Sequence, residues 1–395
     1  MIRRLITGPL LLILAVLAAA PAAAQLVPLG REQRVDTSAT AGYCPALAAD
    51  AGGGFTVAWA NTQDESIHSC TPAGRLYTRT YDRDGTAEAP PFLAVRAGDR
   101  CVYDLRVGTA PGEEPLFTWR EEAGKYGGHS VAVARSGGSE HSLRRGVLVP
   151  LPSGDFVTLL RASGNGRRGV VVERRHDPEE EGRSFLAGIN GGADAAEMPD
   201  GGLVIVWSQG YARRIGVTVH GRRFDADGRP LGPAFLISGN DFASSNREVM
   251  VAANEAGQFV VTWTSIAGPV SSSYAMARAY GSDGQPASPV LRVSPRVEAR
   301  QSQRPSRPAI DEQGRFVVLW RHYDARNPAE AKLSARMFEA NGRRLGPELR
   351  LADWSPVSGC AGVASLEDGR WVMAWGRHPF YADASGIYLQ RFTSE

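Results

Sequence analysis

The sequence predicts an all-β protein, a seven-bladed β-propeller built from four-stranded antiparallel blades. Three observations predict this fold: an apolar run that recurs seven times, a fixed order of turns and short strands around each copy, and one motif divided between the two ends of the chain. Repeats of about 40–60 residues are typical of propellers and related arrays.

The recurring run is a short apolar segment that ends in tryptophan in six of its seven copies. The spacings between successive ends are 60, 41, 47, 56, 57 and 55 residues; the copies end at Trp59, Trp119, Leu160, Trp207, Trp263, Trp320 and Trp375. A strand that is apolar on both faces is expected between two covering layers. We therefore predict that each run is buried between two neighbouring sheets, and that the tryptophans belong to the core.

Each copy holds three further strands in a fixed order. An alanine-rich strand precedes the run, and a turn such as "NEAGQ" joins the two. After the run come a longer loop, a strand that ends in Tyr or Phe, a tight turn such as "DADG" and a last strand. Glycine-containing turns between apolar strands predict hairpins. Each repeat is thus a predicted meander of strands a to d, which favours a propeller over a β-sandwich. An open β-solenoid array remains an alternative.

One motif explains how the array ends. "RRFDADGRPLGPAFLIS" (222–238) returns as "RMFEANGRRLGPELRL" (336–351), whereas "PLGREQRV" (28–35) and "LQRF" (389–392) are its two halves. The seventh repeat therefore lacks a last strand, and the start of the mature chain supplies one. Pairing the two is predicted to close the ring and to remove exposed sheet edges.

The predicted organisation is a signal peptide, residues 1–24, followed by a single propeller domain, residues 25–395. The domain divides into a closing outer strand of blade 7 (25–36) and blades 1 to 7 at 43–97, 98–145, 146–187, 190–239, 246–294, 304–352 and 357–395.

The first residues have the pattern of a secretory signal peptide. Arg3 and Arg4 precede an apolar run at 5–20, and "APAAAQ" supplies an Ala-x-Ala cleavage site before Gln25. The sequence therefore predicts a periplasmic or secreted protein, with no membrane span in the mature chain.

The repeats resemble the propeller-like repeats of many secreted bacterial proteins, on the pattern "P.va.ddGgfvvvW…rrfda.G.plg". The resemblance covers nearly the whole mature chain. It implies a fold and no particular activity, so function has to be argued from a site.

The charge of the chain argues against nucleic acid as a partner. The formal net charge is +2, and removal of Arg3 and Arg4 brings it to 0. A neutral protein has no electrostatic footprint for a polyanion of that size. The expected partner is an envelope protein, a glycan or a small anionic ligand. The mature chain is expected to be a monomer, and no cofactor or metal is expected.

The four cysteines predict two disulfides. Cys44, Cys101 and Cys360 are assigned to one repeat position, the start of strand a, and Cys70 to the loop after strand b of blade 1. Exported proteins oxidise such thiols. The preferred pairs are Cys44–Cys360 and Cys70–Cys101, with metal binding by these thiols as the alternative.

Arginines and histidines that follow strand b form the candidate binding site. The residues are Arg120, Arg321, His322, Arg377 and His378. Guanidinium forks bind carboxylates and phosphates in two-point contacts, and histidines move protons or bind metals. The alternative is an ordinary polar surface, because the basic side chains of this chain are nearly all arginine.

Two classes of function follow from these residues. The first is a ligand-binding or protein-binding scaffold of unknown specificity. The alternative is a hydrolase or lyase that acts on an anionic polysaccharide through the Arg/His loops of blades 6 and 7, with Asp324 and Glu121 or Glu122 as candidate carboxylates. No catalytic residue is assigned. The chain has no His-Glu-x-x-His or Gly-x-Ser-x-Gly motif. "GNGRRG" (164–169) runs into a strand where a dinucleotide site needs a helix. "DADG" lacks the distal glutamate of a calcium loop and is predicted to be a hairpin turn.

Overall fold

The computed structural model describes most of the chain after residue 24. The described ranges are 25–36, 42–61, 74–97, 101–122, 129–138, 140–144, 146–164, 167–177, 183–186, 192–210, 216–239, 244–267, 272–295, 301–324, 327–352, 361–377 and 386–394. Within these ranges the chain is all-β, with 29 strands and one turn of 3-10 helix, Glu367–Gly369.

Five four-stranded antiparallel sheets account for most of the strands. Four of them are simple meanders of consecutive strands. They comprise β2 (Gly42–Ala49), β3 (Phe55–Asn61), β4 (Gly74–Tyr81) and β5 (Phe92–Ala97); β6 (Cys101–Gly108), β7 (Leu116–Glu122), β8 (His129–Arg135) and β9 (His141–Arg144); β10 (Val147–Pro150), β11 (Phe156–Gly164), β12 (Arg167–Arg175) and β13 (Arg183–Leu186); and β14 (Ala193–Glu197), β15 (Leu203–Gln209), β16 (Thr218–Phe224) and β17 (Phe235–Leu236).

The fifth four-stranded sheet joins the two ends of the described chain. Its order is β1 (Leu26–Arg34), β29 (Gly386–Ser394), β28 (Arg370–Arg377) and β27 (Ala361–Ser365). β1 runs antiparallel to β29, with Leu26 opposite Ser394 and Arg34 opposite Tyr388. This is the strand pairing that the divided motif predicts. The number of blades and closure of the whole ring stay predictions.

A nine-stranded sheet holds the remaining strands. It contains β18 (Ser244–Ala253), β19 (Phe259–Ala267), β20 (Ser272–Tyr280) and β21 (Leu291–Arg292), then β22 (Gln301–Pro305), β23 (Ala309–Ile310), β24 (Phe316–Asp324), β25 (Asn327–Phe338) and β26 (Arg344–Ala352). One parallel pair, Ser273 opposite Ser302, connects β20 to β22. The sheet is therefore two antiparallel meanders joined at a single point.

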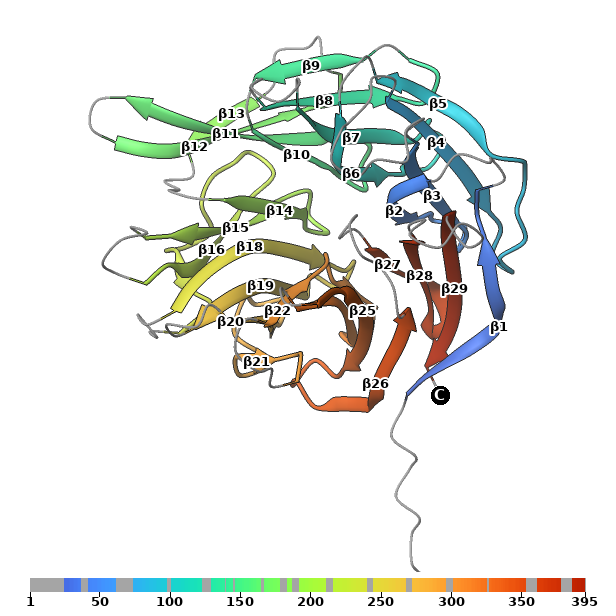
Figure 1. Cartoon of the computed structure of the whole chain (residues 1–395). Helices are drawn as coiled ribbons and strands as arrows, with labels where there is room; N and C mark the ends of the chain where they lie inside the picture. The colour runs from blue at the N-terminus through green and yellow to red at the C-terminus, as the bar shows by residue number, and fades with distance from the viewer. Residues whose placement is uncertain are drawn as a thin grey trace, which may run out of the picture.

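Successive sheets follow one another around a central region, and β1 lies beside β29 (Figure 1). The core lies between neighbouring sheets. Trp207 of β15 packs with residues of the β10–β13 sheet, whereas Val204 and Val206 of the same strand pack with β18 and β19. Alternate side chains of one strand point to opposite faces, so β15 is buried on both sides. This confirms the prediction for the apolar runs, and the tryptophans that end them are at most 2% exposed wherever their side chains are described.

Arginines at one position of the repeat connect neighbouring sheets. Arg79, Arg278 and Arg336 lie two residues before the aromatic residue that ends the third strand of a meander. Their Nη1 atoms donate to main-chain carbonyls of the preceding meander, at Val35 (3.1 Å), Ile237 (3.1 Å) and Val293 (3.0 Å). Part of the arginine excess is therefore structural, and Arg79 connects β4 to the segment that follows β1.

The "DADG" turn is a hairpin, as predicted. The Gly228 N–H donates to the Asp225 carbonyl at 2.9 Å, and the Asp225 carboxylate accepts the Arg229 N–H at 2.7 Å. Gly228 has φ +79°, which an L side chain adopts only with strain. The aspartate is satisfied by the main chain of its own turn and needs no metal.

Candidate functional site

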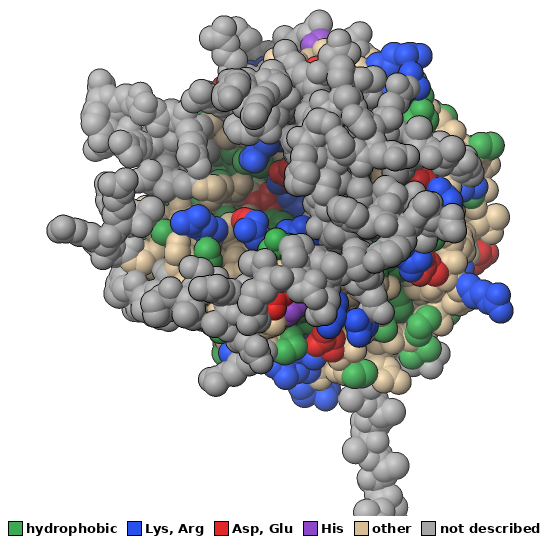
Figure 2. Space-filling model, viewed as in Figure 1, with side chains coloured by type: hydrophobic (Ala, Val, Ile, Leu, Met, Phe, Trp, Pro, Cys, Tyr) green, Lys and Arg blue, Asp and Glu red, His purple; other side chains and the backbone are tan. Residues whose placement is uncertain are grey.

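A central hollow with acidic and basic side chains inside it is visible in Figure 2. Several of the predicted site residues lie at the end of a meander where its first strand begins and its second strand ends. Three first strands carry a β-bulge at this end, and each bulge holds a non-glycine residue at positive φ: Cys44 (52°), Asp104 (48°) and Glu248 (53°). Such backbone costs of the order of 1–3 kcal/mol and is frequent at functional sites. Two of the three strained positions carry a carboxylate.

The bulges correct one assignment made from the sequence. Cys44 and Asp104 are the equivalent residues, because each occupies the bulge opposite the tryptophan of the next strand. Cys101 begins β6, three residues earlier, so it does not share the repeat position of Cys44. The sequence around Cys101 gives no sign of the bulge in β6, so it did not show that Asp104, and not Cys101, is the equivalent of Cys44.

Disulfide pairing stays a prediction. Cys44 is 4% exposed, and the described part of the chain contains no free cysteine. Cys70 and Cys360 lie outside the described residues, and the side chain of Cys101 is not described.

Three charged residues, from β6, from β14 and from the segment between β22 and β23, contact one another. Asp194 of β14 has a fully buried carboxylate, whose Oδ1 accepts from Arg106 Nη1 (2.8 Å) and from Arg307 Nη2 (2.7 Å). Its Oδ2 accepts the Val251 N–H at 2.9 Å. We call Arg106, Asp194 and Arg307 the floor. Because both guanidinium nitrogens bind one oxygen atom at these distances, they lie within about 5.5 Å of each other.

The floor is held together by charge. Burial alone would raise the pKa of Asp194, but Arg307, Arg106 and the Val251 N–H outweigh it and hold that pKa below its usual value. Burial works to lower the pKa of Arg106, whereas Asp104 and Asp194 together raise it. Asp194 is therefore an ionised carboxylate in the core, compensated from two sides.

Two further arginines lie beside Glu248. Arg304 Nη1 donates to Glu248 Oε1 at 2.7 Å, and the Thr264 hydroxyl donates to Oε2 at 2.8 Å. Arg321 lies opposite Arg304 in the β22–β24 ladder and is half-buried. Among the described residues it makes no hydrogen bond or ion pair. Burial, and then the charge of Arg304, lower the pKa of Arg321.

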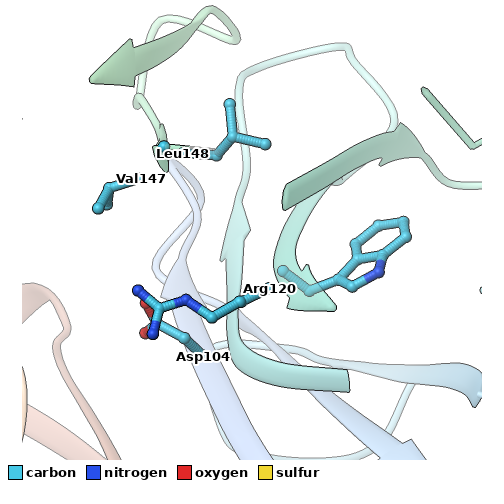
Figure 3. Close-up of a pocket in the computed structure, with 6 residues that line it drawn as sticks. Asp104, Arg120, Val147 and Leu148 are labelled. Carbon is cyan, nitrogen blue, oxygen red and sulfur yellow. The ribbon is translucent and has the colours of Figure 1, made fainter. Parts of the chain in front are cut away.

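Arg120, a residue predicted for binding, lines a small pocket between the β6–β9 and β10–β13 sheets. The lining residues are Asp104, Trp119, Arg120, Gly146, Val147 and Leu148. The guanidinium of Arg120 points toward the carboxylate of Asp104 (Figure 3). Asp104 Oδ2 also accepts from Arg106 Nη2 of the floor at 3.1 Å. We call Asp104, Arg120, Glu248, Arg304 and Arg321 the mouth.

The mouth and the floor together carry more positive than negative charge. These eight described residues comprise five arginines and three carboxylates, a surplus of two positive charges. A concave surface of one sign focuses its field and attracts ions of the other sign.

The remaining predicted residues do not join the mouth as free groups. Arg377 Nη2 donates to Glu32 of β1 at 2.8 Å, and its guanidinium lies 4.3 Å from the centre of the Tyr388 ring. His322 contacts the Gln303 amide at 3.4 Å, and Asp324 accepts from Gln301 at 3.2 Å. The side chains of Glu121 and Glu122 are not described, and His378 lies outside the described residues.

Sequence reasoning missed the floor altogether. Asp194 and Arg106 lie in first strands whose main signal is small or apolar residues, and Arg307 lies between β22 and β23. The contacts of Asp194 with these arginines span 88 and 113 residues of sequence. A charged residue inside an alanine-rich strand, as in "GADAAE" (192–197), was the available signal.

Two searches of the described residues gave no further site. They contain no group of three or more His, Cys, Asp or Glu side chains placed to hold a metal ion. They also contain no helix long and apolar enough to cross a membrane.

Comparison with known proteins supports the fold alone. No family model and no curated protein matches the sequence. The chain is similar in structure to a protein of unknown function from Dyadobacter fermentans, with a TM-score of 0.50 and 14% identity over 94% of this chain and 100% of that one.

Two weaker likenesses involve carbohydrate-active enzymes. The TM-score is 0.48 with an ulvan lyase of family PL25, at 12% identity over 93% of this chain and 94% of that one. It is 0.43 with an α-L-arabinanase of Penicillium chrysogenum, at 11% identity over 93% and 98%. Likeness at this level transfers neither activity nor substrate to the present chain.

Proposed function

We propose that the chain is an exported binding protein, a seven-bladed β-propeller closed by the pairing of β1 into the last blade, that holds an anionic group at its mouth. The packing of the β2–β5 sheet against the sheet that contains β1 and β29 supports the closed ring, since Phe55, Trp59 and Leu389 share one core cluster. The surplus of arginine at the mouth supports the anionic ligand.

The observation that carries the proposal is the state of Arg321. A half-buried guanidinium loses part of its hydration, and in a stable fold such a group normally forms hydrogen bonds with other protein groups instead. Arg321 lacks such a partner among the described residues and lies beside the like charge of Arg304. A carboxylate, phosphate or sulfate held by both arginines would supply the missing hydrogen bonds and the missing charge.

The test is titration of the purified mature protein with acetate and with inorganic sulfate, followed by calorimetry. Hydrogen bonds to charged groups contribute about 1.5–3 kcal/mol, so Arg321→Ala is expected to weaken binding about tenfold or more. Arg321→Lys keeps the charge but loses the two-point contact, and an intermediate affinity is expected.

The matched control is Arg229→Ala, which removes an arginine from an exposed turn where it pairs with Asp227. This variant should bind both anions as the wild type does. Equal weakening by Arg321→Ala and Arg229→Ala, or no binding by the wild type, would contradict the proposal.

An enzyme that cleaves an anionic polysaccharide is the second candidate. It is favoured by one observation: β24 carries His322 one residue after Arg321 and the 9% exposed Asp324 three residues after it, so an imidazole and a carboxylate lie on the same strand as the proposed anion site. Incubation with a panel of acidic polysaccharides should then produce new reducing ends, and this activity should disappear in His322→Ala. A panel without new reducing ends eliminates this candidate and leaves the binding protein.

A further inference from the structure

Arg304 and Arg321 lie close enough to hold one small anion between them. They are directly opposite each other in the antiparallel ladder of β22 and β24. Opposite residues of such a ladder point to the same face of the sheet, with their Cβ atoms about 4.5–5.5 Å apart. Two guanidinium groups that start so close together can donate hydrogen bonds to the same acidic group.

Glu248 belongs to the same site, although it lies on β18, in the other meander of the nine-stranded sheet. Its Oε1 accepts from Arg304 Nη1 at 2.7 Å, and its Oε2 accepts from the Thr264 hydroxyl at 2.8 Å. The side chains of Glu248 and Arg304 are 43% and 52% exposed, so this ion pair faces solvent and not the core. An anion bound to Arg304 would therefore lie close to a carboxylate that the protein itself places there.

The charge of Glu248 also acts on Arg321. Burial and then the charge of Arg304 lower the pKa of Arg321, whereas the charge of Glu248 works in the opposite direction. Among the described residues no hydrogen bond or ion pair joins Glu248 to Arg321, so this effect acts through space. The two arginines and the one carboxylate carry a combined charge of +1.

The fold does not require a carboxylate at this position. Glu248 occupies the bulge of β18, and the equivalent bulges of β2 and β6 hold Cys44 and Asp104. The value of φ is 53° at Glu248 and 52° at Cys44, in the left-handed region that is strained for an L residue. Because an uncharged cysteine adopts the same backbone, the bulge does not explain the charge of Glu248.

A combined charge of +1 favours a ligand that carries a single negative charge. The Coulomb attraction of an anion to the site grows in proportion to its charge, whereas the cost of removing it from water grows about as the square of that charge. A doubly charged anion therefore loses about four times the hydration free energy for about twice the attraction. Glu248 reduces the attraction that would otherwise offset this loss.

We infer that Glu248 makes the anion site selective for singly charged acids, a carboxylate or a sulfate ester, over doubly charged groups such as a phosphate monoester. This inference rests on the proposed anion site and names the class of ligand that it takes. Glu248 weakens the binding of every anion and weakens that of doubly charged anions more, so its role is specificity and not affinity.

The test compares methyl sulfate with inorganic sulfate by calorimetry on the mature protein near neutral pH. Both probes present sulfate oxygens, and they differ by one unit of charge. The wild type is expected to bind methyl sulfate at least about threefold more tightly than sulfate. Glu248→Gln removes the charge and keeps the size of the side chain. It should tighten methyl sulfate binding about threefold and sulfate binding about tenfold, since the Coulomb energy doubles for the doubly charged probe. Acetate, which is also singly charged, should follow methyl sulfate in both proteins.

The matched control is Asp227→Asn, which neutralises an exposed aspartate in a hairpin turn and should leave all affinities unchanged. Tighter binding of sulfate than of methyl sulfate by the wild type would overturn the inference without the use of any variant, and the anion site would stand. A gain for sulfate in Glu248→Gln that is no larger than the gain for methyl sulfate would overturn it as well. Loss of both probes in Arg321→Ala supports the shared site, whereas absence of binding by the wild type would contradict the anion site itself.

Discussion

Removal of the Asp194 carboxylate should destabilise the fold more than removal of any surface acid. The side chain is 1% exposed and receives hydrogen bonds from two guanidinium groups and one main-chain N–H. Asp194→Ala leaves Arg106, with a side chain 14% exposed, paired only with the half-exposed Asp104 among the described residues, whereas Arg307 at 34% can turn partly to solvent. Loss of one partner from a buried ion pair costs about 3–5 kcal/mol. The orphaned Val251 N–H acts in the same direction.

The measurement is urea denaturation followed by tryptophan fluorescence, which suits a chain whose strand-end tryptophans are buried. The control is Asp227→Ala, which removes an exposed ion pair expected to contribute about 1 kcal/mol or less. Arg106→Ala combined with Asp194→Ala should cost less than the two single losses added together, since the second change removes the orphaned charge. A free energy of unfolding that falls no further in Asp194→Ala than in Asp227→Ala would refute the reasoning.

Three further predictions follow from the same contacts. Because the pKa of Asp194 is lowered in the fold, its ionised form stabilises the fold above the usual aspartate pKa of 3.8, and this stability is lost as the pH falls below that value. The free energy of unfolding should therefore fall more steeply with pH below pH 4 in the wild type than in Asp194→Asn. Arg377→Ala should lower the melting temperature because it removes the contacts with Glu32 and Tyr388. Glu32→Gln should lower the melting temperature less, because burial raises the pKa of Glu32. An unchanged melting temperature in Arg377→Ala would show that its contact with Glu32 of β1 does not stabilise the fold. Intact mass should rise by four hydrogen atoms on reduction if the four cysteines form two disulfides, and four free thiols before reduction would defeat the pairing.

The strands were predictable because their signals are local. A buried strand between two sheets leaves a continuous apolar run, as in β15 and β19, and a tight turn requires glycine at positive φ, as at Gly228. The pairing of β1 with β29 was predictable for a different reason. The segments 28–35 and 389–392 are the two halves of a motif whose intact copies form a hairpin, so the two separated halves were expected to pair in the same way.

The surroundings of the candidate binding residues were predictable only in part, because the contacts that define them are not local. Arg120 and Arg321 follow a tryptophan in the repeat, and this position places both at the mouth. Arg377 lies two residues after its tryptophan, on β28, and Glu32 of β1 accepts a hydrogen bond from its guanidinium. The repeat sets the place of a side chain in its sheet, whereas the neighbouring sheet decides whether its charge is compensated.

The floor and the mouth divide the charged residues of the hollow into two functions. Asp194 connects β6, β14 and the segment between β22 and β23, and its two arginines donate hydrogen bonds to that carboxylate, to the Val251 carbonyl and to Asp104, so the floor holds these elements together. Arg321 sits on a strand that β22 and β25 already pair on both sides, so the sheet does not need its guanidinium. The strand pairing of β24 does not depend on this half-buried charge, which is why we propose that Arg321 serves a ligand, and the neighbouring arginines are the reason for proposing an anion.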